Sequence, residues 1–175
     1  MMSPAFSLKH PSCSTKRLTP KDADTLQQLY EHCAAFILLT DGLPPSPTAA
    51  REEFDDLPPG KTTEDIYIFG LFNAEQALLG MITAVQHYPD KQTWWVGLMM
   101  LTPQARGQGL GTDFYRGFEG WVAAQGGLKI SLSVIAENLP GLQFWQNMGF
   151  EVIHQRPPQP FKAKTHRVYV LTRLL

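Results

Sequence analysis

The segment of the chain with the clearest chemical potential is the glycine-rich run from Gln104 to Thr112. Glycines at 107, 109 and 111 remove Cβ atoms where a backbone would approach a ligand closely. A helix predicted to begin near Gly111 adds unpaired N–H groups and the positive end of its dipole. Because both features favour phosphate oxygens, the run is suited to binding a diphosphate.

Two common nucleotide-binding motifs fit this run less well. A P-loop needs Gly-Lys followed by Ser or Thr, and the run contains no lysine, which disfavours nucleoside triphosphate hydrolysis. A dinucleotide fold places GxGxxG on the first strand-to-helix turn, whereas here Thr112 stands at the third small position and three predicted strands come first. A helix-capping loop without any ligand stays open as an alternative.

The elements that must position this run are predicted to be helices in the first third of the chain and strands after it. A helix is predicted from Thr19-Pro20 to about Asp41-Gly42, since its apolar residues recur at intervals of three and four. A short helical stretch follows from about Thr48 to Leu57. Three strands joined by short turns then form an antiparallel meander: Ile66 to Phe72, Leu78 to His87 and Thr93 to Leu101.

After Leu101 strands and helices alternate. The pattern predicts a helix after the glycine-rich run, and then the following elements: a strand from Lys129 to Ile135, a helix from Leu139 to Met148, a strand from Phe150 to His154, a loop from Arg156 to Pro160 and a last strand from Arg167 to Leu174. Strand, helix, strand implies a right-handed parallel crossover. We therefore predict one mixed α/β domain, an α+β mixed sheet with an antiparallel meander followed by a parallel β-α-β crossover. It covers residues 14–175, after a variable N-terminal segment of residues 1–13.

Composition argues against several classes of partner. The 15 Lys plus Arg and 16 Asp plus Glu are scattered, so no basic face for nucleic acid or anionic lipid is expected. The sequence shows no signal-peptide pattern and no run of about 18 apolar residues, which favours a cytoplasmic protein without a membrane span. Cys13 and Cys33 form no CxxC pair, and the five histidines have no metal-ligand spacing. We expect no metal site, and Cys33 as a reduced core thiol.

The same residues resemble the GNAT superfamily of acyl-CoA N-acyltransferases, whose signature is Arg/Gln-x-x-Gly-x-Gly/Ala after a strand. Arg106 to Gly111 matches this signature, with Pro103 ahead of it. The strand Ile130 to Val134, the helix-opening Asn138 and a closing motif from Phe144 that ends in Gly149-Phe150 extend the match. In element order the resemblance covers residues 14 to 174.

The resemblance implies that acetyl-CoA lies between the fourth and fifth strands of the fold, here Trp94 to Leu101 and Lys129 to Ile135. The implied cofactor-binding residues are Met99, Met100 and Leu101 through their backbone, then Arg106, Gly107, Gln108, Gly109, Leu110, Gly111 and Thr112 at the diphosphate, and Asn138 and Trp145. A backbone N–H near Met99 to Leu101 would also stabilise the thioester oxyanion. Structural alternatives stay open: Asn138 is also a favoured helix N-cap, and Trp145 a typical core aromatic.

The resemblance further implies an N-acetyltransferase that uses acetyl-CoA as cosubstrate and acetylates a primary amine of a small molecule or peptide by direct attack on the thioester. An amine with a pKa of about 10.4 must first lose a proton. Many relatives use a glutamate on the fourth strand for this step, but Thr93 to Leu101 contains no acid. The base is therefore unassigned, and a water chain that ends at His87 or at Asp90 is one possible route. Ser133 and Tyr169, on the fifth and last strands, are further candidates for a catalytic role.

Leaving-group protonation is equally open. Relatives often place a tyrosine where this chain has Trp145, and an indole cannot supply a proton. A thiol with a pKa of about 8.5 can still depart as thiolate. The alternative is an acyl-CoA-binding regulatory module with little or no catalysis, and a third interpretation is an interaction domain that binds no coenzyme A.

Family members read the acceptor with two loops, which here are Thr40 to Pro47 and Gln155 to His166. The first contains one acid, Asp41, while the second and its flank carry four cations: Arg156, Lys162, Lys164 and Arg167. This positive excess would favour an anionic acceptor, although solvated loop charge explains it equally well. Exposed tryptophans at positions 94 and 95 would suit a subunit interface as readily as a pocket, which leaves a homodimer open.

Overall fold

The computed structural model describes residues 5–175 as a mixed sheet covered by helices on both faces. The strands are β1 (Ser14–Arg17), β2 (Ile66–Phe72), β3 (Leu78–Gln86), β4 (Thr93–Leu101), β5 (Lys129–Ile135), β6 (Glu151–Phe161) and β7 (Lys164–Leu174). The helices are α1 (Ala23–His32), α2 (Ala34–Asp41), α3 (Ala49–Glu53), α4 (Leu110–Ala124) and α5 (Leu139–Asn147), with short 3-10 turns η1 (Pro20–Asp22) and η2 (Pro103–Ala105).

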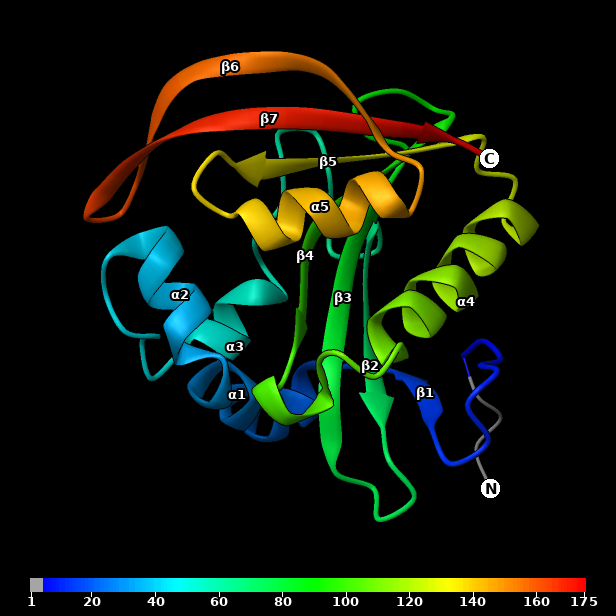
Figure 1. The fold of residues 1–175 in the computed structure, drawn as a ribbon. Helices are drawn as coiled ribbons and strands as arrows, with labels where there is room; N and C mark the ends of the chain where they lie inside the picture. Colours follow the sequence, from blue (N-terminus) through cyan, green and yellow to red (C-terminus); the bar gives the residue numbers. More distant parts are fainter. Residues whose placement is uncertain (1–4) are drawn as a thin grey trace.

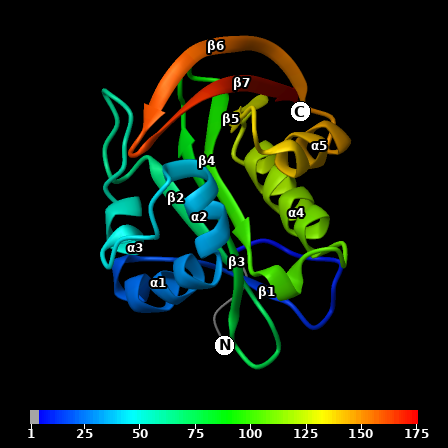
Figure 2. The same ribbon diagram turned by 60° about the vertical axis from the view of Figure 1, so that its left-hand side comes forward.

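The sheet has the order β1-β2-β3-β4-β5-β7-β6, and β4 with β5 is its parallel pair. The predicted meander of β2, β3 and β4 and the predicted parallel crossover through α4 are both confirmed. Helices α1, α2 and α3 cover one face of the sheet, and α4 and α5 cover the other (Figures 1 and 2). The mixed α/β fold class is therefore as predicted.

Each face of the sheet has its own apolar core, because successive side chains of a strand point to opposite faces. On the α4–α5 face, Phe69 and Ile82 meet Phe114 and Phe118 of α4. On the α1–α3 face, residues such as Met81 of β3 contact α1. Burial on both faces explains why β2 and β3 read as continuous apolar runs without alternation.

The predicted single helix from Thr19 to Asp41 is wrong, because the chain turns at Cys33 and forms α1 and α2 instead. Cys33 has φ −97° and ψ 18°, outside helical geometry. Its Sγ donates to the carbonyl of Leu101 at 3.3 Å, so a contact with β4 holds the turn. The apolar spacing continues across this break and for that reason did not reveal it. The predicted end is confirmed, since Gly42 caps α2 with φ 71°.

The predicted loop from Gln155 to His166 is also wrong, because these residues form a β-hairpin. Strand β6 continues to Phe161, β7 begins at Lys164, and both pair antiparallel. The ladder shifts register between Arg156 and Gln159, which accommodates the prolines there. Strand β6 is the outer strand of the sheet, where proline is tolerated because one edge needs no partner.

The residues before β1 pack against the domain. Phe6 is buried and its ring stacks near Phe114 at 5.8 Å between centroids. The backbone N–H groups of Lys9 and His10 donate to the carboxylate of Asp113 at the start of α4, both at 2.9 Å. The boundary after residue 13 stays a prediction. The four-residue β1, which pairs with β2, is too short to show a pattern and was not predicted.

Candidate active site

The central feature of the site is an opening between β4 and β5. These strands pair only from Thr93–Lys129 to Val96–Leu132. At Gly97 a β-bulge follows, since Ala84 pairs with Val96 while Thr83 pairs with Leu98. Such a bulge bends its strand, and the pairing of β4 with β5 ends just before it. Figure 1 shows that the two strands diverge. The second half of β4 thus presents a backbone edge that β5 does not cover.

The backbone groups along this edge alternate in direction. The N–H of Thr102 donates to the carbonyl of Leu79 at 2.8 Å, so Thr102 and Met100 direct their polar groups toward β3. Met99 and Leu101 therefore direct theirs toward the opening. The Leu101 carbonyl already accepts from Arg106 Nε at 3.0 Å and from Cys33. Met99 is consequently the residue best placed to hydrogen-bond an extended ligand.

The glycine-rich turn lies where β4 ends and α4 begins. Gly107 and Gly109 have φ values of 72° and 78°, which favour glycine, and a Cβ at either would meet no described atom within 4 Å. Gly109 caps α4, whose first residue, Leu110, is buried, while Thr112 in the first turn is exposed. Gln108 closes the turn through its Nε2 on the Gln104 carbonyl at 2.6 Å. Open space before unpaired N–H groups fits a diphosphate.

Gly111 has a different environment from the other two glycines. A Cβ there would lie 3.5 Å from the ring of Phe144 and 3.7 Å from Leu101. These are ordinary van der Waals distances, so position 111 packs against α5 and the end of β4 and does not face open space. The diphosphate roles predicted for residues 106–112 remain predictions, and the geometry favours Gly107 and Gly109 as the positions in front of the ligand.

Asn138 is the N-cap of α5 and Trp145 lies on this helix, beside the opening. The Asn138 side chain accepts from the Gly141 N–H at 3.0 Å, so it caps this helix as expected. Trp145 is 8% exposed and makes edge-on contacts with Tyr115 and Phe150, each at 5.2 Å between ring centroids. The contacts of both residues thus have a structural role: Asn138 caps a helix and Trp145 packs in the core. Their contact with coenzyme A stays a prediction.

The three candidate catalytic residues are not brought together. His87 is exposed in the β3–β4 turn, where its Nδ1 lies 2.7 Å from the Lys91 carbonyl, at the opposite end of β4 from the glycine-rich turn. Ser133 is exposed on β5, beyond the last pair with β4. Tyr169 on β7 packs into the core of the α4–α5 face, and its neighbour Val170 pairs with Ser133. Of the three, Ser133 lies at the opening.

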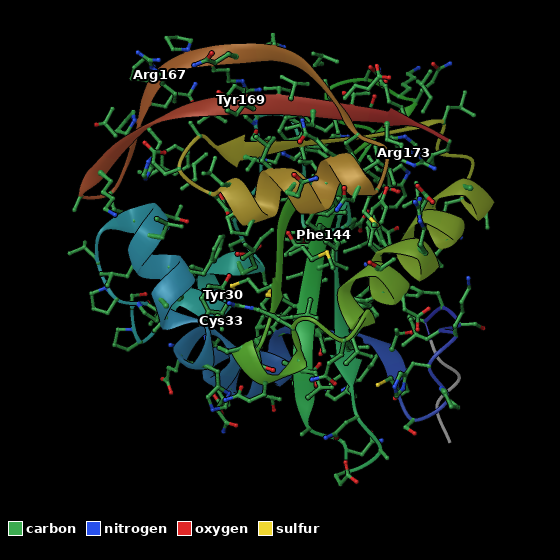
Figure 3. The ribbon with its side chains drawn as sticks, viewed as in Figure 1. Tyr30, Cys33, Phe144, Arg167, Tyr169 and Arg173 are labelled. Carbon is green, nitrogen blue, oxygen red and sulfur yellow. The ribbon has the colours of Figure 1, made fainter. Side chains whose placement is uncertain are left out.

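The sequence interpretation missed a polar cluster on the α1–α3 face of this opening. Tyr30 of α1 donates its hydroxyl to Glu53 Oε2 of α3 at 2.6 Å. The hydroxyl of Thr83, buried on β3, also acts on this carboxylate and lowers its pKa. A Cβ at Gly97 would lie 3.1 Å from Thr83 Oγ1, so the cluster adjoins the bulge of β4. Figure 3 shows Tyr30 beside β4, near Cys33.

Burial governs the protonation of this cluster. Desolvation raises the pKa of the half-buried Glu53 carboxyl, hydrogen bonds from Tyr30 and Thr83 oppose this rise, and the charge of Asp56 adds to it. Burial, followed by the negative charge of Glu53, raises the pKa of the Tyr30 phenol, which therefore stays protonated. The net result is a carboxyl group whose pKa is raised above its ordinary value and which accepts a hydrogen bond from a phenol.

A signal for Glu53 was present in the sequence. Ala50, Glu53, Phe54 and Leu57 follow helical spacing, and Ala50 and Phe54 are buried in the core of this face. Glu53 is thus an acid on the apolar side of its helix. The neighbouring acids obscure this signal, because a run of acidic residues usually indicates a solvent-exposed segment. These acids are Glu52, Asp55 and Asp56.

The two loops predicted to read the acceptor contact each other. The hairpin between β6 and β7 reaches the last carbonyls of α2 through three donors: Lys164 Nζ on Leu39 at 3.1 Å, His166 Nε2 on Thr40 at 2.8 Å and Ala163 N–H on Asp41 at 2.9 Å. Lys162 also pairs with the Asp41 carboxylate at 3.0 Å. Cations at a helix C-terminus are favourable. Lys162 and Lys164 therefore stabilise the fold, which weakens the argument for an anionic acceptor.

The tryptophans of β4 differ from the expectation. Trp94 is 2% exposed and packs against Trp121 of α4, so its predicted exposure is wrong; adjacent side chains of a strand cannot both face solvent when one face is a core. Trp95 is half-buried between Tyr88 and Arg156, whose guanidinium lies 5.6 Å from its ring centroid. A homodimer stays a prediction.

Residues 5–175 contain no group of three or more His, Cys, Asp or Glu side chains able to hold a metal ion. Within the same range, no helix has both the length and the apolar character needed to cross a membrane. Cys33 is a buried free thiol, as predicted.

Several solved structures have a similar fold. An acetyltransferase from Thermus thermophilus has a TM-score of 0.73 and 22% identity, over 94% of this chain and 97% of that chain. Spermidine N-acetyltransferase from Vibrio cholerae, in complex with CoA and spermine, has a TM-score of 0.72 and 16% identity, over 93% and 95%. The ribosomal-protein-S18-alanine N-acetyltransferase of Escherichia coli has a TM-score of 0.71 and 13% identity, over 93% of both chains.

Comparison of the sequence with known protein families identifies the family of this chain. No curated protein sequence matches this chain significantly. The sequence model of the Acetyltransferase (GNAT) family matches residues 24–150, which include α1 to α3, the meander, the glycine-rich turn and the closing Gly149-Phe150. Since this match covers more than half of the sequence, the chain belongs to the GNAT family of acetyltransferases.

Proposed function

We propose that this acyltransferase moves the acetyl group of acetyl-CoA to a primary amine of a small molecule or peptide, by direct attack of the amine on the thioester. The observation that carries the proposal is the uncovered edge of β4, which leads into the glycine-rich turn at the start of α4. An extended backbone edge suits a pantetheine arm, and a helix N-terminus suits a diphosphate.

The acceptor class follows from the site and from similar proteins. The carboxyl of Glu53 on the α1–α3 face offers a group that favours an ammonium over an anion. Among proteins with this fold, one is a spermidine N-acetyltransferase and another acetylates the alanine of ribosomal protein S18. Spermidine and an alanine-initiated peptide are therefore the first acceptors to test.

Within this proposal each part of the site has one task. The N–H groups from Gly107 to Thr112 hold the diphosphate. Met99 bonds the pantetheine arm, and its N–H is directed to where the thioester oxygen would gain charge, which stabilises the oxyanion. Asn138 caps α5 beside the same arm.

The cofactor assignment is tested by isothermal titration of the protein with acetyl-CoA, with ATP and NAD as controls. We expect selective micromolar binding, about −8 kcal/mol. Gly109→Trp should abolish it by filling the space before the turn. Gly126→Trp is a matched control, because Gly126 also has a positive φ, 84°, and open surroundings but lies beyond the other end of α4. Equal affinity in both variants would contradict the diphosphate assignment.

An acyl-CoA-binding module without catalysis makes the same prediction for binding and differs in turnover. The observation that favours it is Trp145, which cannot protonate a leaving thiolate. Release of coenzyme-A thiol with spermidine or the peptide as acceptor separates the two. Tight binding of acetyl-CoA without release in the presence of any primary amine would favour the module.

A further inference from the structure

We propose that Glu53, carried by α3, accepts the proton of the acceptor ammonium, and that Tyr30 of α1 is the positioning residue that holds its carboxylate. The inference rests on the proposed function and names the catalytic base of that reaction. The base thus comes from a helix on the α1–α3 face, not from β4.

Glu53 lies close to the strand segment where the acyl group must sit. The acyl group must lie near the bulge at Gly97, because β4 leaves β5 there and the uncovered edge begins. Thr83 Oγ1 lies 3.1 Å from where a Cβ of Gly97 would stand, and this hydroxyl is close enough to the Glu53 carboxylate to lower its pKa. Thr83 thus lies between Glu53 and the strand segment that would face the thioester. The Glu53 carboxylate lies on the α1–α3 face of the sheet, whereas α4, which follows the glycine-rich turn, lies on the other face.

The surroundings of Glu53 also suit a base. A base is most effective when its pKa is close to the working pH, and desolvation raises the pKa of Glu53 in that direction. The charged groups that act on the Tyr30–Glu53 pair are Asp56, which follows α3, and Asp41 at the end of α2. Both are negative, and Asp41 is already paired with Lys162. Because the cluster, as far as the described residues define it, contains no cation, an incoming ammonium would be its natural counter-charge.

The reaction conserves protons and electron pairs. The Glu53 carboxylate takes one proton from the ammonium and leaves a neutral amine. The nitrogen lone pair forms a C–N bond with the thioester carbon, the C–S bond breaks, and sulfur departs with the bonding pair as coenzyme-A thiolate. The remaining excess proton on nitrogen passes to this thiolate, which gives the amide and the thiol. Glu53 then releases its proton to water.

A purely structural role is the competing explanation, since the Tyr30–Glu53 bond also ties α1 to α3. Glu53→Gln separates the two roles, because a glutamine oxygen still accepts from the Tyr30 hydroxyl but cannot take a proton. Glu52→Gln is the matched control on the same helix, since Glu52 is exposed and its carboxylate accepts a hydrogen bond from the Thr48 hydroxyl.

The experiment measures thiol release from acetyl-CoA against pH, with spermidine and the alanine-initiated peptide as acceptors. In Glu53→Gln we expect kcat to fall on the order of 100-fold or more with unchanged acetyl-CoA affinity, and the acidic limb of the kcat/KM profile to disappear. In Tyr30→Phe the carboxylate loses a donor that stabilises its charge. The pKa of Glu53 then rises, and the acidic limb should move to higher pH.

Each outcome decides one point. If wild type and Glu53→Gln turn over equally, the assignment of Glu53 is wrong while the proposed function stands. If both variants lose thermal stability but keep the wild-type pH profile, the cluster is structural only and the assignment is also wrong. If wild type binds acetyl-CoA yet acetylates no primary amine, the proposed function fails and Glu53 with it.

Discussion

Single side chains around the opening differ in whether they face open space or are packed. Gly107 and Gly109 face space, whereas Trp145 is enclosed by the rings of Tyr115, Phe144 and Phe150. A hydroxyl at position 145 would therefore be surrounded by aromatic carbon and would have no clear path to a sulfur. The difference between this chain and relatives with tyrosine there is thus a difference in packing as much as in proton supply.

Trp145→Tyr should consequently destabilise the protein without raising turnover. A smaller ring loses part of three edge-on contacts, and we expect the free energy of unfolding to fall by about 1–2 kcal/mol. Trp145→Phe is the control, since it makes the same change in size without a hydroxyl. Urea denaturation and kcat of all three proteins check this. A higher kcat in the tyrosine variant alone would show that departure of the thiolate limits the rate.

At the residue scale, the sequence predicted those features that depend on residues close together in the chain. The glycine-rich turn and the capping role of Asn138 both follow from residues within a few positions of each other, and the structure shows both geometries. Glu53 could not be assigned that way, because Tyr30 and Thr83 are 23 and 30 positions away along the chain. Only the packing of α1 and α3 on β3 brings the three together.

Among the elements, the contact between α2 and the β6–β7 hairpin bears most directly on the predicted acceptor site. It joins the two segments that are predicted to read the acceptor and fixes their separation. His166 is its central residue, because it is buried and both ring nitrogens have partners: Glu137 Oε2 and the Thr40 carbonyl, each at 2.8 Å. Loss of this ring would leave the Thr40 carbonyl without its buried partner.

His166→Ala should loosen the hairpin from α2. We expect a loss of about 1–3 kcal/mol in the free energy of unfolding and faster amide hydrogen exchange at residues 162–166 and at the end of α2, with β1 and β2 unchanged. His154→Ala is the matched control, since His154 is an exposed histidine on the same hairpin. The same exchange in both variants would show that the contact does not hold the hairpin.

The elements that sequence patterns predicted poorly are those fixed by contacts elsewhere. Prolines 157, 158 and 160 argue against a strand, yet β6 forms because it is the outer strand and shifts its register around them. The turn at Cys33 interrupts an apolar spacing that is otherwise regular, because the thiol bonds β4. By contrast β5 and β4 were predicted with their observed bounds, since both are buried apolar runs between clear turns.

At the scale of the whole molecule, the opening divides the sheet into two parts. Strands β1 to β4 form one, and β5, β7 and β6 the other; four residue pairs between β4 and β5 join them. Helix α4 packs against both parts, since its core includes Ile82 of β3 and Leu132 of β5. A ligand that hydrogen-bonds the uncovered edge of β4 would fill the gap and add to this connection.

Acetyl-CoA should therefore stabilise the entire domain against heat. A ligand that binds only the folded state at a concentration of about 100 times its Kd adds about 2.7 kcal/mol. For a domain of this size each kcal/mol corresponds to roughly 2–4 °C, so we expect Tm to rise by about 5–10 °C. Calorimetry of wild type, Gly109→Trp and Gly126→Trp with acetyl-CoA checks this. The Tm of wild type and of Gly126→Trp should rise, and that of Gly109→Trp should not. A similar rise with ATP or NAD would mean that the turn recognises any diphosphate, and that the uncovered edge of β4 contributes nothing to selectivity.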